Sequence, residues 1–257
     1  MQNVVPYPRH LIGMLTPSSN TVLEPYTARM LEPLFPAVSA HFGRFRVTRI
    51  ALDDSASEQF RQEPILAAAE LLADARTDII AWNGTSASWL GFDTDERLCA
   101  QIHARTGVKA TSAILSLNRL IAERGVKRLG LVTPYTEDVG ARIVANYASI
   151  GVEVVAGSHC GMSDNFSFAE IDEDRIGQMC TDVAGAAPDA IAIVCTNMRG
   201  ALVGAQVERA LGIPVFDSVS TTLWGCLREM GVSTAPLAPF GSLFATPSGA
   251  GLALAGE

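Results

Sequence analysis

The second half of the chain repeats the first. Three short segments recur in the same order, and the offset between the copies drifts by only 6 residues from one match to the next. IGMLTP at 12–17 returns as LGLVTP at 129–134, DIIAWNGTS at 78–86 returns as DAIAIVCTN at 189–197, and GVKA at 107–110 returns as GIPV at 212–215. Because ordered self-similarity marks a duplicated structural unit, we expect two halves of the same topology.

Each copy alternates short apolar runs with longer stretches of helical spacing. In the first copy we expect strands at 11–15, 45–52, 78–82 and 108–111, and helices near 22–34, 63–75 and 114–123. Strands and helices that alternate in this way form βαβ units around a parallel sheet. The predicted fold class is α/β, with two pseudo-symmetric lobes, each a four-stranded parallel sheet flanked by helices, and the active site in the cleft between the lobes.

The repeat also suggests where the lobes begin and end. We expect an N-terminal α/β lobe over residues 1–118 and a C-terminal α/β lobe over 119–221, with segment 222–244 packing back on the first lobe. The final residues, 245–257, are small and rich in Gly and Ala, so we expect a flexible tail.

Charge and cysteine usage restrict the class of partner and the compartment. The net charge is −8 and basic residues form no cluster, so we expect neither a nucleic-acid nor an anionic membrane partner. Five cysteines without CxxC spacing or a Cys/His array fit a reducing compartment, and we expect a cytoplasmic protein. The N-terminal residues do not resemble a secretion signal, and no 18-residue apolar run follows.

Motifs for bound nucleotides and metals are missing from the sequence. No P-loop, GxGxxG or HExxH pattern occurs, so we expect no cofactor and no metal ion. A small dicarboxylate substrate is the expected partner, and a homo-oligomer stays possible.

Small polar residues follow four of the predicted strands. These stretches are TPSSN at 16–20, NGTS at 83–86, TPY at 133–135 and CTN at 195–197. Ligands of open parallel sheets bind beyond the carboxyl ends of the strands, and the first backbone N–H groups of a following helix can bind an anion. The sequence therefore predicts a carboxylate site where the two lobes face each other.

The internal alignment places Gly84 in the first lobe opposite Cys195 in the second. A cleft with a thiol on each side can remove a proton from one face of a carbon and return it on the other, whereas a single thiol serves one face only. This chain has the second thiol and not the first. Close packing of Gly84, and a core position for Cys195, are the alternative structural explanations.

These motifs resemble the aspartate/glutamate racemase superfamily, in the branch of maleate cis-trans isomerases and arylmalonate decarboxylases. The likeness rests on GMLTPSSNT, NGTSASW, VTPYTEDV, SDN and VCTN, and it covers nearly the whole chain. The isomerase pattern implies that Asn20, Tyr135 and Asn165 hold substrate carboxylates, with Pro17 and Ser18 in the same polar stretch as Asn20.

The first-lobe GTS is instead similar to the decarboxylase. That likeness implies that Thr85, Ser86 and Tyr135 surround one carboxylate, that Thr196 contributes a backbone N–H, and that Cys195 is the proton donor. Decarboxylases have glycines where Thr196 and Asn197 follow the cysteine here, which implies a more polar substrate than an arylmalonate.

We therefore expect a cofactor-independent decarboxylase of an aryl- or alkyl-substituted malonate, with its enediolate in an oxyanion hole and protonated by Cys195. The alternative is a maleate cis-trans isomerase, or a racemase of the aspartate, glutamate or hydantoin type, acting on a small dicarboxylate. A Gly84→Cys substitution is expected to create racemase activity if the cleft works with two thiols. A non-catalytic carboxylate-binding protein is the alternative from another class.

Overall fold

The computed structural model describes residues 9–50, 52 and 62–245. The first half contains β1 (His10–Pro17), α1 (Leu23–Leu31), η1 (Glu32–Leu34), β2 (Val38–Phe45), α3 (Gln62–Asp74), β3 (Ile79–Trp82), α4 (Ala87–Leu90), α5 (Asp93–Thr106), β4 (Lys109–Ser112) and α6 (Ala113–Glu123). The second half contains β5 (Arg128–Thr133), α7 (Glu137–Ser149), β6 (Glu153–His159), η3 (Ser167–Glu170), α8 (Glu173–Ala184), β7 (Ala190–Ile193), α9 (Gly200–Leu211), β8 (Val215–Asp217), α10 (Ser218–Glu229), η4 (Ala235–Phe240) and η5 (Ser242–Phe244).

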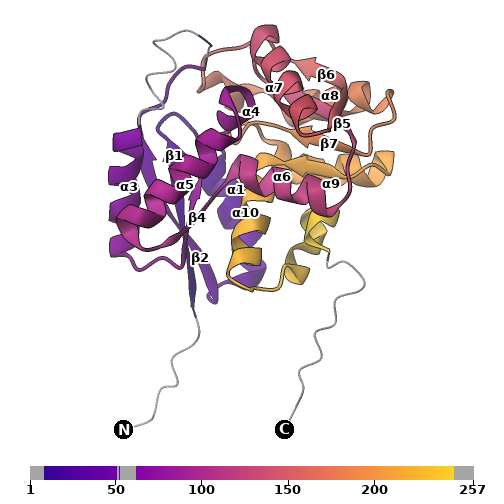
Figure 1. The fold of residues 1–257 in the computed structure, drawn as a ribbon. Helices are drawn as coiled ribbons and strands as arrows, with labels where there is room; N and C mark the ends of the chain where they lie inside the picture. Colours follow the sequence, from indigo (N-terminus) through magenta and orange to yellow (C-terminus); the bar gives the residue numbers. More distant parts are fainter. Residues whose placement is uncertain (1–8, 51, 53–61, 246–257) are drawn as a thin grey trace, which may run out of the picture.

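The two halves have the same sheet topology, which confirms the predicted fold class. The strand order is β2-β1-β3-β4 in the first sheet and β6-β5-β7-β8 in the second, and every pair of neighbouring strands is parallel. The central strands β3 and β7 are buried along their whole length, as expected for strands covered by helices on both faces. Figure 1 shows the two lobes one above the other, with helices on both sides of each sheet.

The prediction of a strand at 45–52 is wrong. The second strand is β2, which ends at Phe45 and pairs along its whole length with β1. The residue pattern did not predict β2, because this edge strand carries His41, Gly43 and Arg44 and its apolar pattern is therefore weak. The residues after Phe45 leave the sheet and run towards the other lobe, where the N–H of Ile50 donates to the carbonyl of Ser163 at 2.8 Å.

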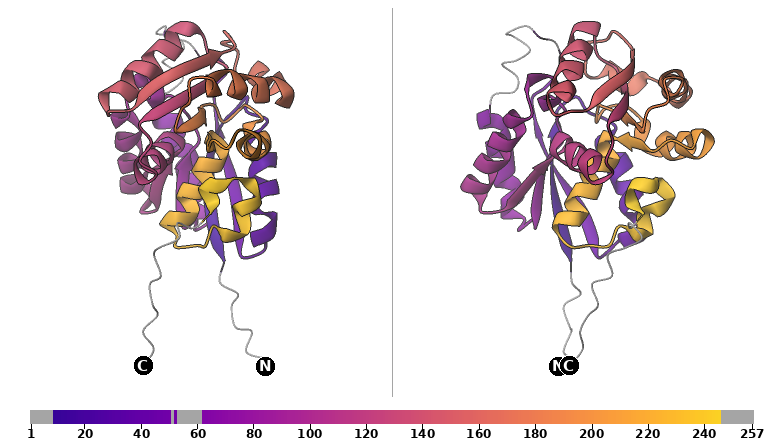
Figure 2. Two further views of the ribbon diagram at one scale, coloured as in Figure 1. Left: turned by 90° about the vertical axis from the view of Figure 1, so that its right-hand side faces the viewer. Right: turned by 45° about the vertical axis from the view of Figure 1, so that its right-hand side comes forward.

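Helix α10 joins the end of the second sheet to the first lobe. It contacts α6, α1 and β4, and it lies beside the first lobe in all three views (Figures 1 and 2). The packing on α6 is close, since a Cβ at Gly225 would lie 2.2 Å from the Ser116 hydroxyl oxygen. The lobe boundary at 118 falls within α6, so that division stays a proposal, and residues 246–257 of the predicted tail lie outside the described residues.

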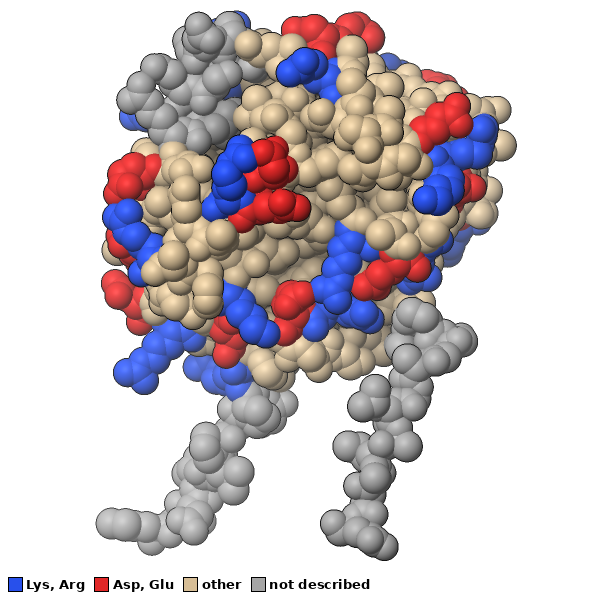
Figure 3. Space-filling model, in the orientation of Figure 1, with Lys and Arg blue, Asp and Glu red and all other residues tan. Residues whose placement is uncertain are grey.

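Charged side chains of both signs are mixed over the face shown in Figure 3. Several form ion pairs between elements, such as Arg105 with Glu63 and Glu70, and Arg119 with Glu229. All five cysteines are free. Within the described ranges, no helix combines the length and the apolar character needed to cross a membrane.

Candidate active site

A small pocket of about 20 Å³ lies between the lobes, at the carboxyl ends of the central strands. Gly84 and Cys195 both line it, from the loops that follow β3 and β7. Of the other predicted site residues, Pro17, Thr85, Ser86, Tyr135, Asn165 and Thr196 also line it. Eight of the ten predicted site residues therefore lie together in the inter-lobe pocket, at the place that the repeat predicted.

Ser18 and Asn20 do not line the pocket. The Asn20 side-chain oxygen accepts from the backbone N–H groups of Val22 and Leu23 at 2.9 Å each, so it begins α1 as a capping group. Its amide nitrogen donates to the Thr196 hydroxyl at 3.2 Å. The Ser18 hydroxyl contacts the backbone of Val47. In this structure both side chains hold the walls of the pocket together.

A network of polar contacts joins the lobes around the pocket. The Asn197 side chain accepts from the N–H of Thr21 at 2.9 Å and donates to the carbonyl of Asn165 at 2.5 Å. The Thr196 hydroxyl donates to the carbonyl of Asn83 at 2.8 Å. The bonds from Thr21 to Asn197 and from Thr196 to Asn83 cross from one lobe to the other, whereas the bond from Asn197 to Asn165 lies within the second lobe.

Residues 47–50 cross the cleft as a strap. Besides the bond from Ile50 to Ser163, the strap carries a backbone bond from the Asn165 N–H to the carbonyl of Thr48 at 3.0 Å. Arg49 and Asp164 form an antiparallel bridge between them. The strap places Val47 and Ile50 against the pocket, which makes one wall apolar.

Cys195 is buried in this pocket as a thiol. Burial raises its pKa to about 12, against the smaller lowering effects of the Asn197 N–H and the Tyr135 hydroxyl. The Asn197 N–H donates to the Cys195 sulfur at 3.3 Å. A group with this pKa keeps its proton at neutral pH, and the two donors beside it can stabilise the thiolate once the proton has left.

Tyr135 lies between the loops that follow β3 and β7. Its hydroxyl lies 2.7 Å from the Thr85 hydroxyl, and burial raises its pKa well above the ordinary value, so it stays protonated. The rings of Trp89 and Phe168 pack edge-on against it, with centroids 5.1 and 5.6 Å away. The phenol is therefore held in place as a donor between the two lobes.

Backbone donors add to these hydroxyls. The N–H groups of Thr85, Ser86 and Thr196 donate to no protein acceptor within the described part of the chain. The Ser86 hydroxyl makes no capping bond to the short helix α4 that follows. Free N–H groups and hydroxyls around one point are what a developing oxyanion requires.

Packing explains why residue 84 is a glycine. A Cβ at Gly84 would lie 2.1 Å from Cζ2 and 2.4 Å from Cε2 of Trp82, so the indole fills the space of a side chain. A cysteine at position 84 therefore requires the buried Trp82 ring to move, and the expectation that Gly84→Cys creates racemase activity stays a prediction.

The analysis of the sequence missed three lining residues, Val47, Ile50 and Asn83. The first two were assigned to a strand, and their apolar character gave no sign that they cross the cleft. Asn83 precedes Gly84 in the polar stretch after β3, and that position was its available signal. Trp89 also lines the pocket.

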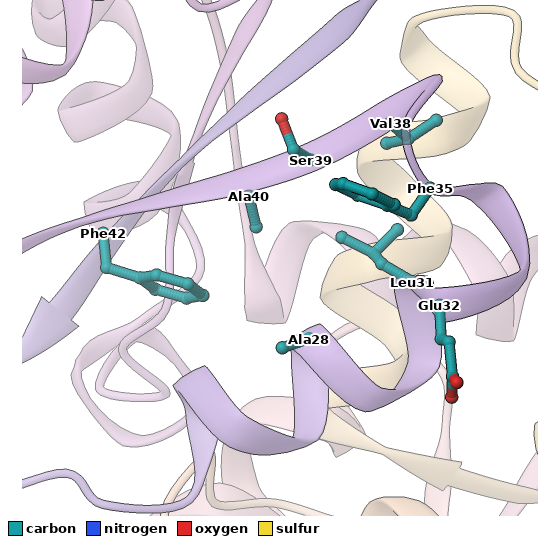
Figure 4. Close-up of a pocket in the computed structure, with 8 residues that line it drawn as sticks. All are labelled: Ala28, Leu31, Glu32, Phe35, Val38, Ser39, Ala40 and Phe42. Carbon is teal, nitrogen blue, oxygen red and sulfur yellow. The ribbon is translucent and has the colours of Figure 1, made fainter.

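An apolar groove elsewhere offers no comparable chemistry. It holds about 320 Å³ between α1, Phe35 and β2, and Glu32 and Ser39 are its polar side chains (Figure 4). Over the described residues, no group of three or more His, Cys, Asp or Glu side chains is placed to hold a metal ion. The inter-lobe pocket is thus the best-supported active site.

The chain is similar to known enzymes over most of its length. The chain is 25% identical over 234 residues to a maleate isomerase of Geobacillus stearothermophilus, covering 87% of this chain and 92% of that protein. It is 25% identical over 236 residues to the arylmalonate decarboxylase of Bordetella bronchiseptica, covering 91% and 95%.

Solved structures share the fold. A Nocardia farcinica maleate cis-trans isomerase with a covalently bound succinylcysteine intermediate superimposes with a TM-score of 0.83 at 20% identity, covering 93% of this chain and 99% of that chain. An arylmalonate decarboxylase gives a TM-score of 0.69 at 23% identity, with 91% and 98% covered. The family model for arylmalonate decarboxylase matches residues 22–244. The chain therefore belongs to the arylmalonate decarboxylase family, whose relatives among known proteins are decarboxylases and maleate isomerases.

Proposed function

We propose that this protein is a cofactor-independent decarboxylase of a malonate-type dicarboxylate with an aryl or alkyl substituent. The observation that carries the proposal is the single thiol of the pocket. Cys195 lies on one side, and on the other side Gly84 leaves its space to the Trp82 indole. One protonated thiol can protonate one face of a carbanion, and an enzyme that works from both faces needs a second group.

The reaction needs three events at this site. One carboxylate of the substrate lies among the donors of Thr85, Ser86 and Tyr135. The bond from the α-carbon to the other carboxyl group breaks, CO₂ leaves, and the electron pair becomes an enediolate whose oxygens accept hydrogen bonds from those donors. The Cys195 thiol then donates its proton to the α-carbon, and the resulting thiolate regains a proton from water.

The Cys195 environment fits the last event. Because burial raises the pKa of the thiol to about 12, the proton is present until the basic enediolate forms. The Asn197 N–H, 3.3 Å from the sulfur, then stabilises the thiolate. The Tyr135 hydroxyl contacts Thr85 and Cys195. It has one proton, which it can donate to an enediolate oxygen first and to the sulfur once the thiol has given up its own proton.

Proton NMR in D₂O, with 2-methyl-2-phenylmalonate and maleate in one tube, tests the proposal. We expect 2-phenylpropanoate carrying deuterium at the α-carbon, and unchanged maleate. A Cys195→Ala variant should bind both the diacid and the monoacid but lose turnover. Fumarate formation with no loss of CO₂ would refute the decarboxylase proposal.

Isomerisation of maleate is the second candidate. Its support is the maleate isomerase relative, which matches as well as the decarboxylase relative at 25% identity. Asn165 also lines the pocket, at the position that the isomerase pattern assigns to carboxylate binding. The same NMR experiment decides between the two, because the isomerase releases no CO₂ and converts maleate to fumarate.

A further inference from the structure

Trp82 is the last residue of β3, two positions before Gly84, so both residues face the same side of the chain. The indole is buried and packs on Phe45, with ring centroids 4.9 Å apart. Its benzene ring reaches the position of a Gly84 side chain, as the 2.1 Å distance from Cζ2 to that Cβ position shows. The indole therefore lies directly behind Gly84, which lines the catalytic pocket.

A second cavity of about 190 Å³ lies on the other side of this indole. Trp82, Ser86, Asp95 and Leu98 are among its lining residues, and Ser86 lines the catalytic pocket as well. The catalytic pocket holds about 20 Å³. Ser86 lines both spaces, and the Trp82 indole lines the larger one, behind Gly84.

The Trp82 indole nitrogen and the Asp95 Oδ2 atom are both buried, and neither has a hydrogen bond of ordinary geometry. The indole N–H still acts on the Asp95 carboxyl group, since it lowers the pKa of Asp95 against the larger raising effect of burial. A smaller apolar side chain at position 82 therefore removes this contact as well as the ring.

We infer that Trp82 is the specificity-determining residue of the first lobe: its indole closes the cavity bounded by Ser86, Asp95 and Leu98, and limits the substrate to malonates whose α-substituent is no larger than one ring. This inference rests on the proposed decarboxylase function for its substrate class. Replacing the indole with a smaller side chain joins the cavity to the catalytic pocket and gives a second ring of the substituent a place to bind.

The test compares one-ring and two-ring ligands. We would measure kcat/KM of the parent and of Trp82→Leu for 2-methyl-2-phenylmalonate and 2-methyl-2-(2-naphthyl)malonate. Calorimetry would give the Kd of the corresponding monoacids, 2-phenylpropanoate and 2-(2-naphthyl)propanoate, which bind without reaction. Trp224→Leu is the matched control, because Trp224 is equally buried but lies on α10, between Arg119 and Arg228.

We expect the naphthyl-to-phenyl ratio to rise at least about 10-fold in Trp82→Leu, in kcat/KM and in affinity, and to stay unchanged in Trp224→Leu. A ratio within about 2-fold of the parent's, in a Trp82→Leu protein with the parent's circular dichroism, would overturn the inference. Should Trp82→Leu fail to fold, Trp82→Phe decides by the same ratio, with a smaller rise expected.

The two readouts separate this inference from the proposed function. If no variant releases CO₂ but the affinity ratio still rises in Trp82→Leu, then the decarboxylase proposal fails and the role of Trp82 stands. If CO₂ is released but the naphthyl-to-phenyl ratio is unchanged in Trp82→Leu, then the decarboxylase proposal stands and the role of Trp82 is refuted. If neither monoacid binds the parent or any variant, the inference is overturned with the proposed site.

Discussion

Replacing Tyr135 with Phe removes one oxygen atom from the centre of the proposed oxyanion hole. The lost hydroxyl lies 2.7 Å from the Thr85 hydroxyl and also contacts Cys195. Loss of one donor of this kind costs about 3–4 kcal/mol of transition-state stabilisation, which is a fall of about 10²–10³ in kcat. The ring keeps its contacts with Trp89 and Phe168, so KM should change much less than kcat.

The cost in folding stability should be no larger than this. Deleting the Tyr135 hydroxyl leaves Thr85 without this partner, and a buried group in that position typically costs about 1–3 kcal/mol. Thermal unfolding followed by circular dichroism measures this effect, and NMR detection of the monoacid measures turnover. A domain with an ordinary stability of about 5–15 kcal/mol stays mostly folded after such a loss, so a fall in kcat measured well below the Tm of the variant is not caused by unfolding.

Tyr147→Phe is a matched control. Tyr147 is also fully buried, but its hydroxyl has no hydrogen-bond partner in the described structure, and its ring packs against Phe92 with centroids 5.3 Å apart. Removing that hydroxyl should leave turnover unchanged and should not lower stability. If Tyr135→Phe keeps more than about a tenth of the parent's kcat, the assigned role of Tyr135 in the oxyanion hole is refuted.

Three further changes test other parts of the site. Gly84→Cys should lower the Tm and should not produce fumarate from maleate, because the new side chain meets the Trp82 ring. Adding Trp82→Ala to Gly84→Cys should restore part of the lost stability. A Gly84→Cys protein as stable as the parent would contradict the steric explanation. The kcat of the parent should stay constant between pH 7 and 10, because burial raises the pKa of Cys195 to about 12 and keeps this proton donor protonated. A fall in kcat with a midpoint near pH 8.5, the pKa of about 8.5 of an ordinary cysteine, would contradict the assigned role of Cys195. Burial raises the pKa of Asp95 from 3.8 to about 7, so the protonated carboxyl group contributes fully to stability below about pH 4, and this contribution is lost as pH rises to about 7. The free energy of unfolding in urea should therefore fall by up to a few kcal/mol over that range in the parent and not in Asp95→Asn. An unchanged fall in the variant would show that Asp95 does not cause it.

The repeat predicted the fold class and the position of the site because both follow from the backbone. Each copy places the end of its third strand at the cleft, so Gly84 and Cys195 face the same pocket wherever the remaining chain runs. Thr85, Ser86 and Tyr135 were likewise found from their positions at strand ends.

The sequence could not predict what fills the space between these residues. Val47 and Ile50 have the apolar character of strand residues, and contacts made in the folded chain, such as the cross-lobe bonds from Ile50 to Ser163 and from Asn165 to Thr48, place them as a wall. Asn20 has the composition of a carboxylate ligand, yet its side chain is occupied by α1 and Thr196. The fit of Trp82 against Gly84 depends on a side-chain conformation, which the pattern of residue types does not encode.

The strap over the cleft has a consequence for binding kinetics. We expect its bonds from Ile50 to Ser163 and from Asn165 to Thr48 to break when a dicarboxylate enters, because the pocket of about 20 Å³ is smaller than such a ligand. Each such bond contributes about 1 kcal/mol net, so an open form is a minor population of the free protein. The apparent Kd for substrate is the intrinsic value divided by that open fraction. Substitutions that weaken the strap should therefore tighten apparent binding and speed product release, while leaving the chemistry at Cys195 unchanged.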